Sequence, residues 1–260
     1  MPGSDQYIQI SGQRLHYRFL GPDTDETPLV FLHEGLGSID LWRDFPAEVA
    51  ARSGHPGLAY SRRGYGQSDP LRQPRPLDYL QREALDVLPT LLDDLVSAPP
   101  ILIGHSDGAS ISIVYAGSGY PVAGLVLIAP HVFVEEDGLN SIRAIYESFP
   151  GSGLTEKMAK YHLDPEATFR GWAEAWLHPG FRAWSIEEYL LGIRCPVLLI
   201  QCVDDEYGSM RQLEAIESQV SGPVERLVVP GEGHSPHLVH PEMVAEGILR
   251  FIASVVDSSP

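Results

Sequence analysis

Pro100-Ile-Leu-Ile-Gly-His-Ser-Asp-Gly-Ala109 is the stretch of sequence that decides the fold. An apolar run ends in the pattern Gly104-x-Ser106-x-Gly108, and residues 109–116 continue with apolar spacing typical of a helix. A strand, a tight turn and a helix in this order lift a serine hydroxyl above a sheet in a strained backbone conformation. The glycines are required because a side chain at either position would clash within the turn. We therefore predict that Ser106 is a nucleophile.

Similar apolar runs bounded by turn residues recur on both sides of this stretch, which is typical of strands buried on both faces. The expected strands are 28–33, 57–61, 100–104, 122–129, 196–201 and 224–229, preceded by a hairpin over 7–10 and 14–20. Helical spacing fills most of the intervals, at 41–52, 80–96, 109–116, 210–220 and 241–256. The alternation predicts an α/β protein with a mostly parallel sheet flanked by helices on both faces.

One segment interrupts the alternation after the sixth strand. Residues 133–190 contain short helical patterns rich in aromatic side chains, including Trp172, Trp176 and Trp184, and no strand-like run. We expect this segment to be a helical lid inserted into a core made of residues 1–132 and 191–260. Most of its aromatic side chains hold the lid together, and a few line a pocket.

Composition limits the classes of function. The 260 residues suffice for one large domain with a full core. The 18 basic and 35 acidic residues give a net charge of −17, which opposes binding to nucleic acid or to an anionic membrane surface. No apolar stretch can span a bilayer, and no secretory signal is visible. Two unpaired cysteines, Cys195 and Cys202, favour the reducing cytoplasm, and no zinc-like ligand spacing is present.

Four motifs together resemble the α/β-hydrolase fold family over essentially the whole chain. They are His33-Glu-Gly-Leu-Gly37, Ser61-Arg-Arg-Gly-Tyr-Gly-Gln-Ser68, the turn Gly104–Gly108, and Gly233-His234. The resemblance implies the α/β-hydrolase fold and a serine hydrolase. In the family, the nucleophile, the acid and the base follow one another along the chain, each just beyond a strand.

The resemblance assigns Ser106 as nucleophile and His234 as general base. The family's acid usually ends a Gly-x-x-Asp run, which is Cys202-Val-Asp-Asp205 here and points to Asp205. Because Cys202 replaces the glycine, Asp204 stays an alternative.

Three other histidines are weighed against His234 or against a role in catalysis. His237 and His240 compete for the base role, although both fall at the start of the last helix. His33 is interpreted as a residue that holds its loop. Arg62 is interpreted as part of a turn that braces the floor of the active site, with no chemical role.

Attack on an acyl carbon places negative charge on its oxygen, which two backbone N–H groups can stabilise. The resemblance places these donors at Asp107 and at Gly35 in the loop 33–37. Family members usually have glycine after the histidine of this loop, so Glu34 is a departure. Glu34 either fixes the loop or adds negative charge near the pocket.

Asp107 also carries the sharpest indication of substrate. The Ser-Asp-Gly form resembles amino-acid ester hydrolases related to valacyclovirase, in which the equivalent acid faces a substrate ammonium group. The alternative is a local hydrogen bond in the first turn of the helix, where a carboxylate suits the helix dipole. His131, which follows a strand, either reaches the cleft or holds the lid.

The sequence thus predicts a serine hydrolase that cleaves a small carboxylic ester, thioester, lactone or activated amide through an acyl-enzyme, without a metal or cofactor. The partner is a small ester-like molecule, and the chain is a monomer or a homodimer. A carbon–carbon bond hydrolase or a cofactor-free haloperoxidase would use the same triad. From another class, a non-catalytic ligand receptor on this scaffold can also keep a triad.

Overall fold

The computed structural model describes residues 3–257, and the outer ends of the expected core, 1–2 and 258–260, lie outside that range. Eight strands form one sheet in the order β1-β2-β4-β3-β5-β6-β7-β8, with β1 and β2 antiparallel and the rest parallel. The strands are β1 (Gln6–Ile10), β2 (Gln13–Leu20), β3 (Leu29–Leu32), β4 (Gly57–Ser61), β5 (Ile101–His105), β6 (Gly124–Ile128), β7 (Val197–Asp204) and β8 (Val224–Glu232). The predicted α/β architecture is confirmed.

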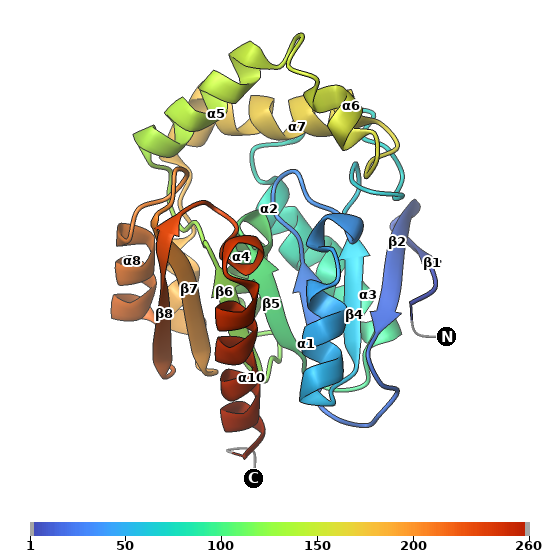
Figure 1. Cartoon of the computed structure of the whole chain (residues 1–260), viewed down its shortest axis with the longest axis vertical. Helices are drawn as coiled ribbons and strands as arrows, with labels where there is room; N and C mark the ends of the chain where they lie inside the picture. The colour runs from blue at the N-terminus through green and yellow to red at the C-terminus, as the bar shows by residue number, and fades with distance from the viewer. Residues whose placement is uncertain (1–2, 258–260) are drawn as a thin grey trace.

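Helices cover both faces of this sheet (Figure 1). On β5, Ile101 and Ile103 point to one face and Leu102 to the other, so both faces need an apolar cover. The first face packs on α1 (Phe45–Ser53) and α10 (Pro241–Asp257). The second packs on α2 (Tyr79–Arg82), η2 (Glu83–Val87), α3 (Leu88–Leu95), α4 (Asp107–Gly117) and α8 (Arg211–Gln219). Two cores result, one on each side of the central strands.

Several element boundaries differ from the expected ones. The helix expected over 80–96 is divided into α2, the π-helical turn η2 and α3. The helix expected over 41–52 begins as η1 (Asp40–Trp42), and α1 follows after a break. Strand β8 extends to Glu232 because its end pairs with the end of β7, where the register shifts between Cys202 and Asp204. Periodicity located these elements, but local irregularities set where they begin and end.

The segment between β6 and β7 is helical, and it lies across the carboxyl ends of the parallel strands (Figure 1). It contains α5 (Glu136–Ser148), α6 (Leu154–Met158), α7 (Pro165–Leu177), η3 (Pro179–Ala183) and η4 (Glu187–Gly192). An isolated bridge between Phe133 and Ser185 ties its two ends together. In residues 3–257, none of the helices is long and apolar enough to cross a membrane.

Candidate active site

Ser106 occupies a strained turn between β5 and α4. Its backbone φ is +52°, a left-handed value that costs energy for a residue with a side chain. The flanking glycines permit this turn, because a Cβ at Gly104 would lie 2.4 Å from the Gly108 carbonyl oxygen and one at Gly108 would lie 2.0 Å from the Leu32 oxygen. The turn is held from below by the Ser106 N–H, which donates to the Ile128 carbonyl at 2.9 Å.

His234 and Asp205 meet on the loops after β8 and β7. The His234 Nδ1 lies 2.9 Å from each Asp205 carboxylate oxygen, and the Asp205 side chain is 1% exposed. Burial alone would raise the pKa of Asp205, but the hydrogen bond from His234 and the Tyr207 N–H bring the pKa below its usual value. Asp205 is therefore an ionised acceptor that holds His234 with Nδ1 protonated and leaves Nε2 as the free ring nitrogen.

The geometry separates the alternatives for acid and base. Asp204 is exposed at the end of β7, and within residues 3–257 its carboxylate makes no hydrogen bond or ion pair with His234. His237 is buried against Trp42 and Phe45, and His240 ends the short helix α9 (Pro236–Val239). Within residues 3–257, the only imidazole hydrogen-bonded to the Asp205 carboxylate is that of His234.

His105, which lies in the turn 104–108, holds the backbone of His234 by a hydrogen bond. Its Nε2 donates to the His234 carbonyl at 2.7 Å, and its Nδ1 lies 3.7 Å from a carboxylate oxygen of Glu34. Ser106 and His234 line the same cavity, but in residues 3–257 no hydrogen bond joins the Ser106 hydroxyl to the His234 ring. Such contacts are often long without substrate and tighten when it binds.

The loop 33–37 is fixed by His33 and Arg62. The Arg62 N–H donates to His33 Nε2 at 3.0 Å, so His33 Nδ1 carries the proton and donates to the Glu34 carbonyl at 2.8 Å. The Arg62 guanidinium donates to the carbonyls of His33 and Glu34 at 2.7 and 2.9 Å. Burial, then the charge of Arg62, holds the pKa of His33 well below its usual range. His33 thus lies in the loop-holding position expected from the sequence, and Arg62 has more partners than the bracing role expected for it.

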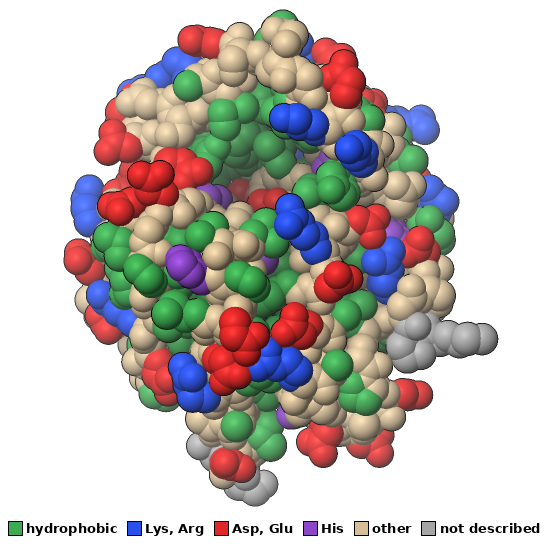
Figure 2. Space-filling view, viewed as in Figure 1, with side chains coloured by type: hydrophobic (Ala, Val, Ile, Leu, Met, Phe, Trp, Pro, Cys, Tyr) green, Lys and Arg blue, Asp and Glu red, His purple; other side chains and the backbone are tan. Residues whose placement is uncertain are grey.

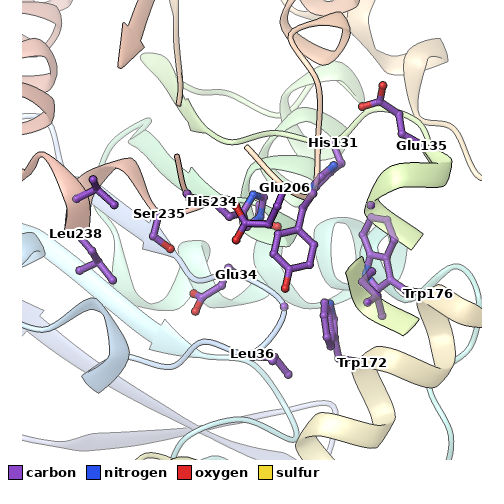
Figure 3. A pocket seen from close by; sticks show the side chains of 17 residues that line it. Glu34, Leu36, His131, Glu135, Trp172, Trp176, Glu206, His234, Ser235 and Leu238 are labelled. Carbon is purple, nitrogen blue, oxygen red and sulfur yellow. The ribbon is translucent and has the colours of Figure 1, made fainter. Parts of the chain in front are cut away.

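A cavity of about 400 Å³ opens in front of Ser106, between the core and the helical insertion (Figures 2 and 3). Three predicted residues besides the serine and the histidine line it: Glu34, Gly35 and His131. No loop or turn hydrogen bond within residues 3–257 uses the N–H of Gly35 or Asp107. Within that range, the N–H of Gly35 in the loop 33–37 and the N–H of Asp107 at the start of α4 are thus both free to donate to a bound molecule.

The prediction that Asp107 faces a substrate ammonium group is not supported. The Asp107 side chain is fully buried and does not line the cavity. It accepts a hydrogen bond from the Tyr79 hydroxyl at 2.7 Å and lies 3.5 Å from the Arg62 guanidinium. Nor does the side chain make, within residues 3–257, the local hydrogen bond expected as the alternative: its donor, Tyr79, is 28 residues away in the chain. The carboxylate is thus already paired with the charge of an arginine and hydrogen-bonded to a tyrosine.

Glu34 and His131 lie on the cavity wall. Burial would raise the pKa of Glu34, but the nearby His105 and Arg62 lower it below the usual value. The Glu34 side chain is 27% exposed. Burial, and then the charge of His234, lowers the pKa of His131 to about 3, so its ring is neutral at working pH. Its ring packs on Trp176 and, at 5.3 Å between centroids, beside His234.

Several cavity residues were not identified from the sequence. Trp172 and Trp176 of α7 are four positions apart and therefore share one face of the helix, a spacing that could have singled them out. Trp172 packs directly on the loop, because a Cβ at Gly35 would lie 2.1 Å from its Nε1. The other lining residues include Glu135, Ile142, Glu206, Tyr207, Leu238 and Val239. In the described part of the chain, no cluster of three or more His, Cys, Asp or Glu side chains could hold a metal ion.

Known proteins share these features to different degrees. A family model described as the alpha/beta hydrolase family matches residues 29–247. Proline iminopeptidase from Lactobacillus helveticus is 28% identical over 114 residues, which cover 44% of this chain and 38% of that protein. Monoglyceride lipase from Rattus norvegicus is 26% identical over 141 residues, 53% of this chain and 46% of that protein.

The chain thus aligns with less than half the length of these two curated relatives. A thermophilic esterase from Thermogutta terrifontis has a similar structure, with a TM-score of 0.76, 16% sequence identity, and coverage of 97% of this chain and 99% of that one. At this identity the structural likeness shows the fold alone.

Proposed function

The chain belongs to the alpha/beta hydrolase family and is a hydrolase, and on that premise we propose that it cleaves small carboxylic esters through an acyl-enzyme on Ser106. The observation that carries this proposal is that His234, hydrogen-bonded to the buried Asp205, lines the same cavity as the strained Ser106. A serine hydroxyl needs a base to attack at neutral pH, and the base needs a partner that fixes its tautomer.

The proposed reaction proceeds in two halves. His234 Nε2 takes the hydroxyl proton while the Ser106 oxygen attacks the acyl carbon, and the N–H groups of Gly35 and Asp107 stabilise the oxyanion. His234 then returns the proton to the leaving alcohol, which departs. A water molecule, deprotonated by the same ring, attacks the acyl-enzyme; the acyl–oxygen bond to Ser106 breaks, the acid leaves, and His234 returns the proton to the Ser106 oxygen. Asp205 stays ionised throughout and stabilises the imidazolium.

The helical insertion acts as a lid in this proposal, because it supplies one wall of the cavity. Trp172 and Trp176 come from the insertion and face the loops that carry the triad (Figure 3), and Ile142 of the insertion lines the same cavity. These apolar surfaces favour an apolar acyl or alcohol group. The names of the relatives include a lipase and a peptidase, so amides belong in the same substrate panel as esters.

The charge of the cavity limits the substrate further. Glu34 and Glu206 face it, and in residues 3–257 no Lys or Arg lines it. A third carboxylate, Glu135, already accepts hydrogen bonds from Ser209 and Gln212. An anionic substrate is therefore disfavoured, and we propose neutral or cationic esters, with Glu34 rather than Asp107 as the residue that senses the charge.

The two free thiols, Cys195 and Cys202, support the further proposal of a reducing compartment such as the cytoplasm.

The proposal is tested with matched p-nitrophenyl esters whose acyl groups are neutral, ammonium-bearing or carboxylate-bearing, together with a proline p-nitroanilide. Steady-state kcat/KM is measured for the natural chain and for Ser106→Ala. We expect turnover of the neutral or ammonium ester and a loss on the order of 10³- to 10⁶-fold in the variant. Full activity in Ser106→Ala would refute the mechanism, and a single stoichiometric burst without turnover would favour a ligand receptor.

The same panel tests the role of Glu34. Glu34→Gln keeps the size of the side chain and removes its charge, so discrimination against the carboxylate-bearing ester should fall about tenfold. Glu135→Gln is the matched control, because its carboxylate is already occupied by protein donors. Equal discrimination in the natural chain and in Glu34→Gln would contradict the assignment.

A further inference from the structure

We propose that Asp107 and Arg62 form one positioning unit that sets both halves of the oxyanion hole, and that Tyr79 and Trp176 connect this unit to the helical insertion. The inference rests on the proposed function, because an oxyanion hole has meaning only for acyl transfer. We call these four residues the elbow network. Arg62 directly follows β4, and Tyr79, Asp107 and Trp176 belong to α2, α4 and α7.

The first half of the hole depends on the Glu34–Gly35 peptide. This peptide is trans, so its carbonyl and its N–H point in opposite directions. The Arg62 guanidinium and the His33 ring both donate to the Glu34 carbonyl, at 2.9 and 2.8 Å. Fixing that oxygen on the protein side therefore fixes the Gly35 N–H on the opposite side. Arg62 also donates to the His33 carbonyl at 2.7 Å, so it holds two successive peptides of the loop.

The second half of the hole is the N–H of Asp107 itself. Its side chain is held by the Tyr79 hydroxyl at 2.7 Å and by Arg62 at 3.5 Å. The charge that anchors the residue beside the nucleophile is therefore the same guanidinium that holds the loop 33–37. Moving either residue moves both donors. A carboxylate that merely capped helix α4 would need no arginine at the position after β4.

Burial makes this arrangement costly to leave incomplete. Arg62 is 2% exposed and Asp107 is fully buried, so removal of one partner leaves the other as an unpaired charge in the interior. Burial, followed by the neighbouring Asp107, raises the pKa of Tyr79 well above its usual range, which keeps the hydroxyl protonated as a donor. Tyr79 thus remains a hydrogen-bond donor to Asp107 at neutral pH.

Trp176 extends the network to the cavity. Its indole N–H donates to the Tyr79 oxygen at 3.0 Å, while its ring lines the cavity and packs on His131. A helix of the insertion is therefore hydrogen-bonded, through one tyrosine, to the residue after the nucleophile. The insertion and the oxyanion hole are held in one arrangement.

The test compares kcat, KM and the inhibition constant of a trifluoromethyl ketone, whose hemiketal oxygen mimics the oxyanion. Arg62→Met and Asp107→Asn should lower kcat by about 10- to 100-fold, the lower end of the effect of losing an oxyanion donor. Both variants should raise the inhibition constant of the ketone by a matching factor and keep KM within about twofold of that of the natural chain. Tyr79→Phe removes only a hydroxyl and should show the same pattern, about three- to tenfold, if the larger changes prevent folding.

Arg75→Met is the matched control. Arg75 stacks on the rings of Tyr65 and Tyr79 in the same buried cluster, but it donates to the Arg63 carbonyl and not to the loop 33–37. It should lower the melting temperature without changing the ratio of ketone affinity to kcat. The inference is overturned if Arg62→Met and Tyr79→Phe keep natural kcat and ketone affinity, or if Arg75→Met changes them equally. In either case the natural chain still turns over esters. If the natural chain itself neither turns over esters nor reacts at Ser106, the proposed function fails first.

Discussion

The two sides of the site each contain a buried carboxylate, and the two carboxylates serve different ends. On the triad side, formed by the loops after β7 and β8, Asp205 meets a single imidazole at 2.9 Å. On the elbow side, formed by the loop 33–37, Arg62 and the start of α4, Asp107 meets an arginine and a tyrosine and never reaches the cavity. The difference shows that the neighbours of a carboxylate, more than its distance from the nucleophile, decide its chemical role.

The largest effect is expected on the triad side. Asp205→Asn removes the charge that orients His234 and should lower kcat by about 10⁴-fold. Asp204→Asn is the matched control, since the adjacent carboxylate is exposed at the end of β7, and it should be silent. Steady-state kinetics on one ester decides the point, and equal losses in the two variants would show that the comparison between the carboxylates is wrong.

On the elbow side, Gly35→Ala tests how closely the insertion approaches the oxyanion loop. The new Cβ would lie 2.1 Å from Trp172 Nε1, so either the indole or the loop must move. We expect kcat to fall by at least about tenfold, because a displaced N–H no longer meets the oxyanion. Trp172→Ala in the same chain should restore most of the loss. Absence of rescue in the double variant would show that the indole does not determine the position of the loop.

Buried histidines on both sides predict acid lability. Burial lowers the pKa of four histidines around the site: His33 in the loop 33–37, His131 after β6, His162 between α6 and α7, and His237 in α9. As the pH falls below about 6.5, the unfolded chain binds protons that the folded chain refuses. The stability contributed by the neutral rings is therefore present above that pH and is lost below it, by up to about 1.4 kcal/mol per pH unit for each histidine.

The carboxylates act in a lower range of pH. The pKa values of Glu34 and Asp205 are lowered from ordinary values of 4.5 and 3.8, so their contribution to stability is lost only as the pH falls below those values. Urea denaturation between pH 5 and 7 therefore reports on the histidines and not on Glu34 or Asp205. The His237 ring packs on Trp42 and Phe45. In His237→Phe, the slope of the unfolding free energy against pH should therefore fall by the equivalent of about one proton. An unfolding free energy that does not change between pH 7 and 5 would contradict the burial of these rings.

The smallest effect is expected where the insertion joins the elbow network. Trp176→Phe removes one hydrogen bond, worth about 0.5–1.5 kcal/mol of stability, and should lower kcat a few-fold through Tyr79. Trp184→Phe is the control, because in residues 3–257 the Trp184 indole N–H has no hydrogen-bond partner. Thermal unfolding and kcat of the two variants are compared directly. Identical behaviour would mean that the Trp176 N–H contributes nothing specific.

The triad side was accessible to sequence reasoning because its residues follow buried strands in a fixed order. Apolar runs place Asp205 and His234 at strand ends, and parallel strands bring those ends together. Asp204 stayed an alternative because Cys202 replaces the glycine that fixes the register of the motif, and the end of β7 does contain a register shift between Cys202 and Asp204.

The elbow side was not accessible in the same way. The partners of Asp107 are Tyr79 and Arg62, and Trp176 donates to Tyr79 from 97 residues away in the chain. No sequence motif indicates that these side chains contact one another. A carboxylate beside the nucleophile therefore suggested contact with substrate, while burial directed it into the protein. Only the folded arrangement of Tyr79, Arg62 and Trp176 around Asp107 decides between these orientations.

The central claim, a nucleophilic Ser106 activated by His234, is tested most directly by intact-protein and peptide mass spectrometry after reaction with an alkyl fluorophosphonate. We predict one adduct per chain, located on the peptide that contains Ser106 and absent in Ser106→Ala. The rate of labelling should fall by orders of magnitude in His234→Asn. No adduct, or an adduct that persists in Ser106→Ala, would contradict the account.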